Sequence, residues 1–194
     1  MKIIKVLTVV ALVSIPLTSA FSEHSSVYLF LDEETAETKF DGLNVMLRAE
    51  LSDKDQKERD FARTPRVWIT CQDSGRQIMS IDTADDLDPW PSITDDQHIE
   101  VDSKLISQTG AFPDLATRMS ASRRLHLLDL NIDITGRAED VARSWLQGFP
   151  IKLTAAPGGD LSDLDLVIFP GSSSAAFRTQ VATLVRACEI LAET

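Results

Sequence analysis

The chain has 194 residues and a formal net charge of −11 at pH 7, because 30 acidic residues outnumber 19 basic ones. An acidic surface argues against nucleic acid and anionic lipid as the main partners, since both attract clusters of Lys and Arg. Cationic partners are compatible with this charge, and so is an acidity that serves only solubility.

The N-terminus has the features of a secretory signal peptide. Lys2 and Lys5 precede an apolar stretch over residues 6–17, and the small residues Ser19 and Ala20 follow it. This pattern predicts that residues 1–20 are removed on export. An uncleaved membrane anchor is the alternative, but the stretch is shorter than the roughly 20 residues that cross a bilayer. We expect residues 21–194 to form a single domain, periplasmic or secreted, without stable membrane insertion of the mature form.

The first half of the mature chain predicts mainly β-structure. Strands are expected over residues 26–31, 43–51, 66–71 and 77–81, with turns at residues 32–34, 41–42 and 72–75. Val67, Ile69 and Cys71 share one face of the third strand, because side chains alternate along a strand. The third and fourth strands are close enough in the sequence to form a β-hairpin.

The second half mixes helices and strands. A short helix is expected within residues 110–122, where Leu115 and Met119 are four residues apart. Further along, strands are expected over residues 125–134, 149–153 and 164–169, and helices over residues 137–146 and 177–191. The last helix is amphipathic, and one of the serines at 172–174 is expected to cap its N-terminus.

Cys71 and Cys188 are the two cysteines of the chain. In an exported protein two cysteines most simply form one disulfide, although free or intermolecular thiols stay open. The chain has neither a CxxC redox motif nor a Cys/His zinc pattern. The bridge would join the apolar face of the C-terminal helix to the first strand of the hairpin. The sequence thus predicts an α+β fold, in which a C-terminal amphipathic helix packs on an antiparallel sheet and one disulfide holds the two together.

An acidic connection around a tryptophan is the predicted partner-binding element. Pro89 and Pro91 flank Trp90, and a rigid aromatic side chain can anchor a partner at low entropic cost. The acidic residues that we include in this candidate contact are Asp86, Asp88, Asp95 and Asp96. The alternative, which is the more common arrangement, is a plain acidic loop with Trp90 folded onto the core.

One group of residues has the spacing of a calcium loop. Asp129, Asn131 and Asp133 alternate along the chain, and Asp140 takes the twelfth position of such a loop. Ile134 stands where the sharp turn of the loop requires glycine. An alternating strand explains the same residues, so we expect no metal here.

The remaining polar candidates also have structural explanations. Ser172, Ser173 and Ser174 follow a predicted strand and open a helix, but the GxSxG pattern of a nucleophilic serine is missing. His126 lies on the apolar side of its predicted strand, where a hydrogen-bonded structural histidine is common. Since nothing in the sequence assembles an acid, a base and a nucleophile, we expect no enzymatic activity and no cofactor.

The two cysteine regions resemble those of a known family. Residues 65–75 read PRVWITCQDSG and residues 184–188 read LVRAC. Together with the signal peptide, they are similar to the small periplasmic accessory proteins of type VI secretion, the TagO/VasI-like family. In that family a strand cysteine followed by a polar turn pairs with a cysteine in the last helix. The resemblance implies a non-enzymatic role in assembly or envelope binding, with Cys71 and Cys188 as structural residues.

A second group of proteins shares some of these features. The Cys-x-Asp-x-Gly turn, the predicted export and the acidic charge also resemble small periplasmic lysozyme inhibitors, which meet a cationic enzyme through complementary charge. The inhibitory loop motif of that group is missing, and a secreted hydrolase ranks lower still. We therefore expect an exported non-enzymatic protein that binds an envelope protein or a cell-wall component, and inhibition of a cationic enzyme is the alternative.

Overall fold

A computed structural model describes most of the chain between Val27 and Ala192. The described residues are 27–53, 64–83, 97–108, 110, 112–124, 127–158, 161–162, 164–170 and 174–192. The predicted signal peptide, His126, Ser172 and Ser173 lie outside them. So do Trp90 and the four aspartates of the candidate contact, Asp86, Asp88, Asp95 and Asp96.

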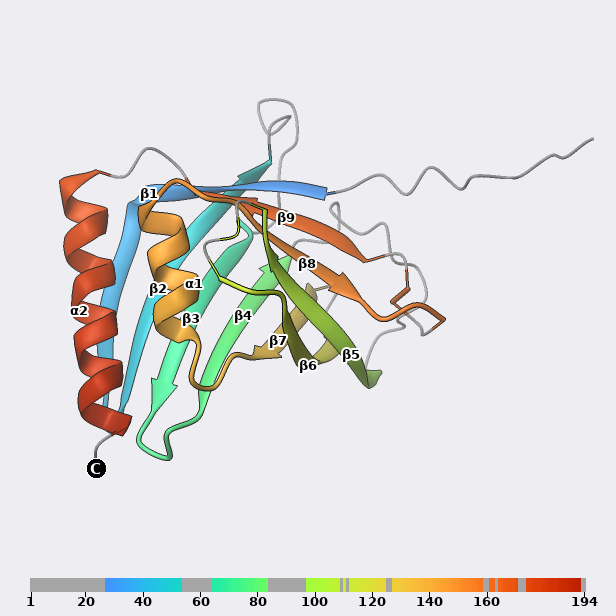
Figure 1. Cartoon of the computed structure of the whole chain (residues 1–194), viewed down its shortest axis with the longest axis horizontal. Helices are drawn as coiled ribbons and strands as arrows, with labels where there is room; N and C mark the ends of the chain where they lie inside the picture. The colour runs from blue at the N-terminus through green and yellow to red at the C-terminus, as the bar shows by residue number, and fades with distance from the viewer. Residues whose placement is uncertain are drawn as a thin grey trace, which may run out of the picture.

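In the described part of the chain, nine strands close into a barrel (Figure 1). They are β1 (Val27–Asp41), β2 (Asn44–Asp53), β3 (Arg66–Gln72), β4 (Gln77–Thr83), β5 (His98–Ser107), β6 (Leu115–Arg124), β7 (Leu127–Asp133), β8 (Ile151–Ala155) and β9 (Asp165–Phe169). Their order around the barrel is β1-β2-β3-β4-β7-β6-β5-β8-β9. All neighbouring pairs are antiparallel except β1 and β9, which run parallel and close the sheet.

This closure shows that the predicted α+β class was wrong. The expected sheet was open, with a C-terminal helix packed on it, whereas β1 pairs with β9 from Val27 opposite Leu166 to Phe30 opposite Phe169. The pairing joins segments from the two ends of the described chain, and a local pattern carries no information about such a contact. Two helices accompany the barrel, α1 (Ala138–Leu146) and α2 (Ala175–Ala192).

Two local predictions also failed. The acidic residues 32–34 do not form a turn, because β1 continues through them with a shift of register between Asp32 and Glu37. The reversal comes later, at Gly42, whose positive φ of 60° suits glycine. Residues 110–122 do not contain the expected helix, since Leu115 and Met119 belong to β6. The predicted hairpin is confirmed as β3 and β4, and the later strands and helices are confirmed within a few residues.

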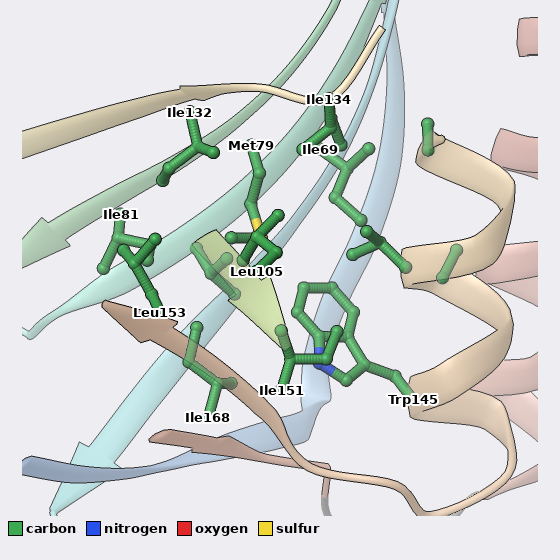
Figure 2. Close-up of a cluster of buried hydrophobic side chains, with 14 of the residues drawn as sticks. Ile69, Met79, Ile81, Leu105, Ile132, Ile134, Trp145, Ile151, Leu153 and Ile168 are labelled. Carbon is green, nitrogen blue, oxygen red and sulfur yellow. The ribbon is translucent and has the colours of Figure 1, made fainter. Parts of the chain in front are cut away.

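The barrel interior is a packed apolar core (Figure 2). Met79, Leu105 and Ile132 come from three strands and are each fully buried. The Trp145 side chain of α1 points into the same cluster and is 1% exposed. Burying one large apolar side chain contributes about 1.5–3 kcal/mol, so this cluster is a main source of stability.

The helix α2 lies along β1 and contacts α1, β2 and β3 as well (Figure 1). Its N-terminus is capped as expected by one of the serines, because the N–H of Phe177 donates to Ser174 Oγ at 3.1 Å. Gln180 then accepts a hydrogen bond from the N–H of Thr38 at 2.7 Å. This side chain thereby satisfies a backbone N–H of β1, a strand edge that β9 does not cover.

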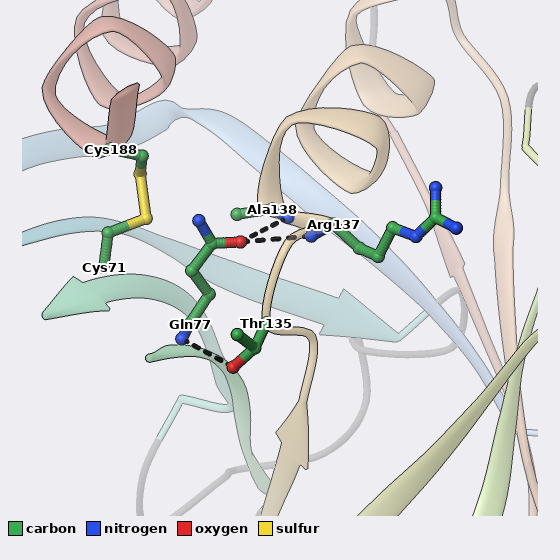
Figure 3. The surroundings of a disulfide bond; sticks show 6 residues. All are labelled: Cys71, Gln77, Thr135, Arg137, Ala138 and Cys188. Atoms are coloured by element: carbon green, nitrogen blue, oxygen red, sulfur yellow. Dashed lines mark hydrogen bonds between the residues drawn. A yellow bond between two sulfur atoms is a disulfide. The ribbon is translucent and has the colours of Figure 1, made fainter. Parts of the chain in front are cut away.

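The predicted disulfide between Cys71 and Cys188 is present (Figure 3). Its Cα atoms are 5.4 Å apart, and the two cysteines are 1% and 6% exposed. The bridge joins β3 to the apolar face of α2, as the sequence predicted. It therefore ties the C-terminal helix directly to the barrel.

Candidate binding trough on the outer face of the barrel

The outer face of β6 carries unusually small side chains. Because side chains alternate along a strand, Met119 and Ala121 point into the barrel, whereas Ala116, Ser120 and Ser122 point outward. Between Ala116 and Ser122, Arg118 is the one large residue on this face. The neighbouring strands present longer polar side chains on both sides, so β6 forms the floor of a depression.

Three adjoining clefts follow this floor. The first has a volume of about 710 Å³, and the second, of about 290 Å³, shares Arg118 and Asp133 with it. The third has a volume of about 490 Å³ and shares Asp102, Ala116 and Thr117 with the first. We call the three clefts together the β6 trough. It runs over the outer faces of β5, β6 and β7.

The free charges of the β6 trough have both signs. Arg118 forms no ion pair or side-chain hydrogen bond within the described residues, and Lys104 is equally free. The carboxylates of Glu100, Asp102 and Asp114 also lack partners in that part of the chain. Because these charged side chains have no ion pair in the described part of the chain, a ligand can bind them without displacing an existing partner.

The two other arginines of the trough are held in place. Arg76 lies 4.0 Å from Asp133, and Arg137 lies 3.1 Å from Asp140. Both pairs are largely exposed, and exposed pairs of this kind contribute about 0–1 kcal/mol. Their main effect is to orient one guanidinium group beside the first cleft and one beside the second.

Asp133 is kept ionised by its neighbours. The Thr135 side chain hydrogen-bonds to its carboxylate, the Thr135 N–H donates to Oδ1 at 3.0 Å, and Arg76 adds a favourable charge. Partial burial opposes these effects, but the net result is a pKa of Asp133 below its ordinary value. The trough therefore keeps a fixed negative charge beside Arg76 at neutral pH.

The polar walls are connected to the barrel by further hydrogen bonds. Ser80 Oγ donates to Asn131 Oδ1 at 2.7 Å on the outer face of β4 and β7. On the inner face, the hydroxyl groups of Ser103 and Thr117 lie 2.6 Å apart and link β5 to β6. These two bonds tie β4 to β7 and β5 to β6, so the strands beneath the trough are held in place before a ligand binds.

The sequence prediction did not find this trough. Among the described residues no group of three or more His, Cys, Asp or Glu side chains could hold a metal ion. Asp129, Asn131 and Asp133 alternate on β7, and Asp140 lies on α1, where it pairs with Arg137. The sequence did contain one indication of the site, the small residues Ala116, Ser120 and Ser122. That these residues share one face is apparent only if residues 115–124 are assigned as a strand.

Comparison of the chain with protein-family models, with curated proteins and with solved structures finds no match. Neither helix in the described part of the chain is long and apolar enough to cross a membrane.

Proposed function

We propose that this chain is an exported, non-enzymatic envelope protein that holds an extended polypeptide segment of a partner in the β6 trough. The observation that carries the proposal is the small-residue floor of β6. Beside it, the charged groups without an ion pair in the described part of the chain are Arg118, Lys104, Glu100, Asp102 and Asp114. Small side chains let a second backbone approach the strand closely. The free charges then select the residues of the bound segment.

The charges favour a segment of mixed sign in which basic residues predominate. Arg118 can form a two-point hydrogen bond with a carboxylate of the ligand. The three free carboxylates can receive Lys or Arg side chains, and the acidic net charge of the chain attracts such a partner from a distance. A small-molecule substrate is less well matched, because none of the three clefts is enclosed.

Export is part of the proposal and is supported by the covalent structure. Disulfides persist in oxidising compartments such as the bacterial periplasm and are rare in the cytosol. The bridge between Cys71 and Cys188 therefore fits the signal peptide that residues 1–20 predict. A periplasmic accessory of a secretion system and an inhibitor of a cationic enzyme would both use a surface of this kind.

The test is capture of partners from the native envelope by the purified protein, followed by mass spectrometry. We expect one captured protein to be lost with Arg118→Glu, which reverses one of the two free cations, and with Ser120→Phe, which fills the floor. Arg48→Glu and Ser52→Phe are matched controls, because both residues point outward on β2, a strand that lines none of the three clefts. Both controls should retain capture.

Two results would contradict the proposal. Capture that is equal for Arg118→Glu, Ser120→Phe and the unchanged protein would place the contact elsewhere. Absence of any captured component at low salt would argue against a binding role. In a separate assay, slowing of a cationic muramidase that weakens as salt rises would favour the inhibitor alternative over the secretion accessory.

A further inference from the structure

The first half of β5 has a neighbouring strand on one side only. β6 pairs with β5 from its first residue, His98, whereas the pairing with β8 begins only at Ser103. Pro157 and Gly158, whose φ is 86°, lie in a turn that leads the chain away after β8. In Figure 1 the start of β5 accordingly lies apart from the end of β8. We call residues 98–102 the β5 edge.

The free backbone groups of the β5 edge belong to His98 and Glu100. A β6 N–H donates to the Gln97 carbonyl, whereas the N–H of the residue after β8 donates to the Asp102 carbonyl. Because the backbone groups of successive residues point to opposite sides of a strand, the even-numbered residues of β5 face away from β6. Within the residues that the structure describes, no backbone group meets the N–H and C=O groups of His98 and Glu100.

The apolar side of the β5 edge is also incompletely covered. Ile99 and Val101 face the barrel interior and pack against the core, yet both are partly exposed. Their neighbours on β6, Ala121 and Met119, are fully buried. Since the β6 side is covered, Ile99 and Val101 are exposed toward the side where β5 has no neighbour. A further strand on that side would cover both.

We propose that the β5 edge receives a strand of the partner, so that the bound segment extends the barrel sheet beside β5. This inference rests on the proposed function for the class of partner, an extended polypeptide in which basic residues predominate. Free N–H and C=O groups that recur every second residue match another extended backbone, as in β-augmentation. Glu100 and Asp102 also line the trough, so the added strand lies along its wall.

The side chains of the β5 edge favour a segment with alternating residues. Glu100 and Asp102 are exposed and have no ion pair in the described ranges, so Lys or Arg is expected opposite them. Apolar residues are expected beside Ile99 and Val101, on the inner face. A second copy of the chain would bring the same two carboxylates and a net charge of −11, so charge favours the basic segment over self-association.

Amide hydrogen exchange followed by NMR tests the added strand, with a synthetic peptide of four Lys-Val repeats as the probe. In the free protein the amides of His98 and Glu100 should exchange fast, whereas those of Ile99 and Val101, which face β6, should be protected. Saturation with the peptide should slow exchange at Glu100 by about tenfold or more. A peptide of the same composition, with its lysines and valines in two blocks, is the matched control and should leave this exchange unchanged.

Two substitutions of Glu100 separate the backbone contact from the charge. Glu100→Gln and Glu100→Pro both remove the carboxylate, but only proline removes the N–H on the free side, where β6 needs no donor. The dissociation constant of the peptide should be about tenfold higher for Glu100→Pro than for Glu100→Gln. Methylation of alternate backbone nitrogens of the peptide should weaken binding similarly, and this test leaves the protein unchanged.

Three results would overturn the proposal. Protection of the Glu100 amide in the free protein at every concentration would mean that the β5 edge is already covered. Protection that rises with protein concentration alone would assign the edge to a second copy of the chain. Saturation with the peptide that adds no protection at Glu100 would place the bound segment elsewhere.

The β5 edge and the trough can fail separately. Added protection at Glu100 that survives Arg118→Glu and Ser120→Phe would contradict the trough and support the edge. Binding of the peptide that these two substitutions abolish, without any added protection at Glu100 in the unchanged protein, would support the trough and contradict the edge.

Discussion

Gln77 is the residue that joins β4 to the start of α1 (Figure 3). Its Oε1 accepts hydrogen bonds from the N–H groups of Arg137 and Ala138 at 3.1 and 3.0 Å. No side chain caps α1 from within its own N-terminal segment, so Gln77 performs this function across the sheet. We predict that Gln77→Ala lowers the free energy of unfolding by about 1–2 kcal/mol, the usual range for a lost cap. Urea denaturation measures this loss.

The matched control for this cap is Gln147→Ala at the other end of α1. Gln147 is exposed, and only its backbone N–H takes part in the end of the helix. Its replacement should change the free energy of unfolding by less than about 0.5 kcal/mol. Equal losses from the two substitutions would show that the Gln77 side chain does not act as a cap of α1.

Asp133 makes the stability of the folded chain depend on pH. Hydrogen bonds from Thr135 hold its folded-state pKa below the ordinary value of 3.8. A carboxylate with a lowered pKa stabilises the fold above its unfolded-state pKa and loses this contribution as pH falls through the folded-state value. We predict that Asp133→Asn is less stable than the unchanged protein at neutral pH. The difference should shrink below about pH 4, and a difference independent of pH in urea denaturation would contradict the assignment.

At the scale of the element, α1 contributes mainly through Trp145, which fills one end of the barrel core (Figure 2). We predict that Trp145→Ala lowers the free energy of unfolding by about 3–5 kcal/mol, because a large cavity remains. Trp145→Phe should cost less than half of that. It keeps most of the apolar volume, and it removes a buried indole N–H that has no hydrogen-bond partner among the described residues.

The control for these two substitutions is Arg143→Ala on the exposed side of α1. Within the residues that the structure describes, Arg143 is paired only with Glu139 on the same helix, and such a pair contributes about 0.3–0.5 kcal/mol. Thermal denaturation of all four proteins would separate core packing from helix formation. A loss in Arg143→Ala as large as that in Trp145→Ala would mean that α1 is stabilised by its own surface and not by the barrel.

The elements that the sequence predicted correctly have strong local patterns. β7 alternates Leu128, Leu130 and Ile132 with polar residues, so its period of two is unambiguous. β6 has no such contrast, because the spacing of four between Leu115 and Met119 fits both a helix and a strand. Pairing with β5 and β7 decides between them. The small outward residues that hid this strand also form the floor of the trough, so one feature concealed both the element and the site.

For the whole molecule, the sequence predicted one long-range contact and missed another. Both cysteines lie on apolar faces, which indicated that the C-terminal helix meets β3, and the disulfide confirms it. The parallel pairing of β1 with β9 was not predictable in the same way. Hydrogen bonds between backbones leave no residue-specific signal, and closure of a barrel depends on the tilt of all its strands together.

The disulfide closes a long covalent loop, because its two cysteines are 117 residues apart in the sequence. In the simple chain model a loop of this size removes up to about 4–5 kcal/mol of unfolded-state entropy, less any strain in the folded state. We predict that the double substitution Cys71→Ala/Cys188→Ala lowers the free energy of unfolding by about 2–5 kcal/mol. The double variant leaves no free thiol, so denaturant titrations can be compared without reductant.

The form of the transition shows how α2 depends on this bridge. α2 also contacts β1 and β2 and is held by the bonds between Thr38 and Gln180, so we expect the variant to unfold in one step at a lower denaturant concentration. Far-ultraviolet dichroism follows the helices, and near-ultraviolet dichroism follows the packing of aromatic side chains. Coincident curves from the two methods would indicate that α2 and the barrel unfold as one unit. An earlier far-ultraviolet transition would show instead that the bridge alone keeps α2 on the barrel.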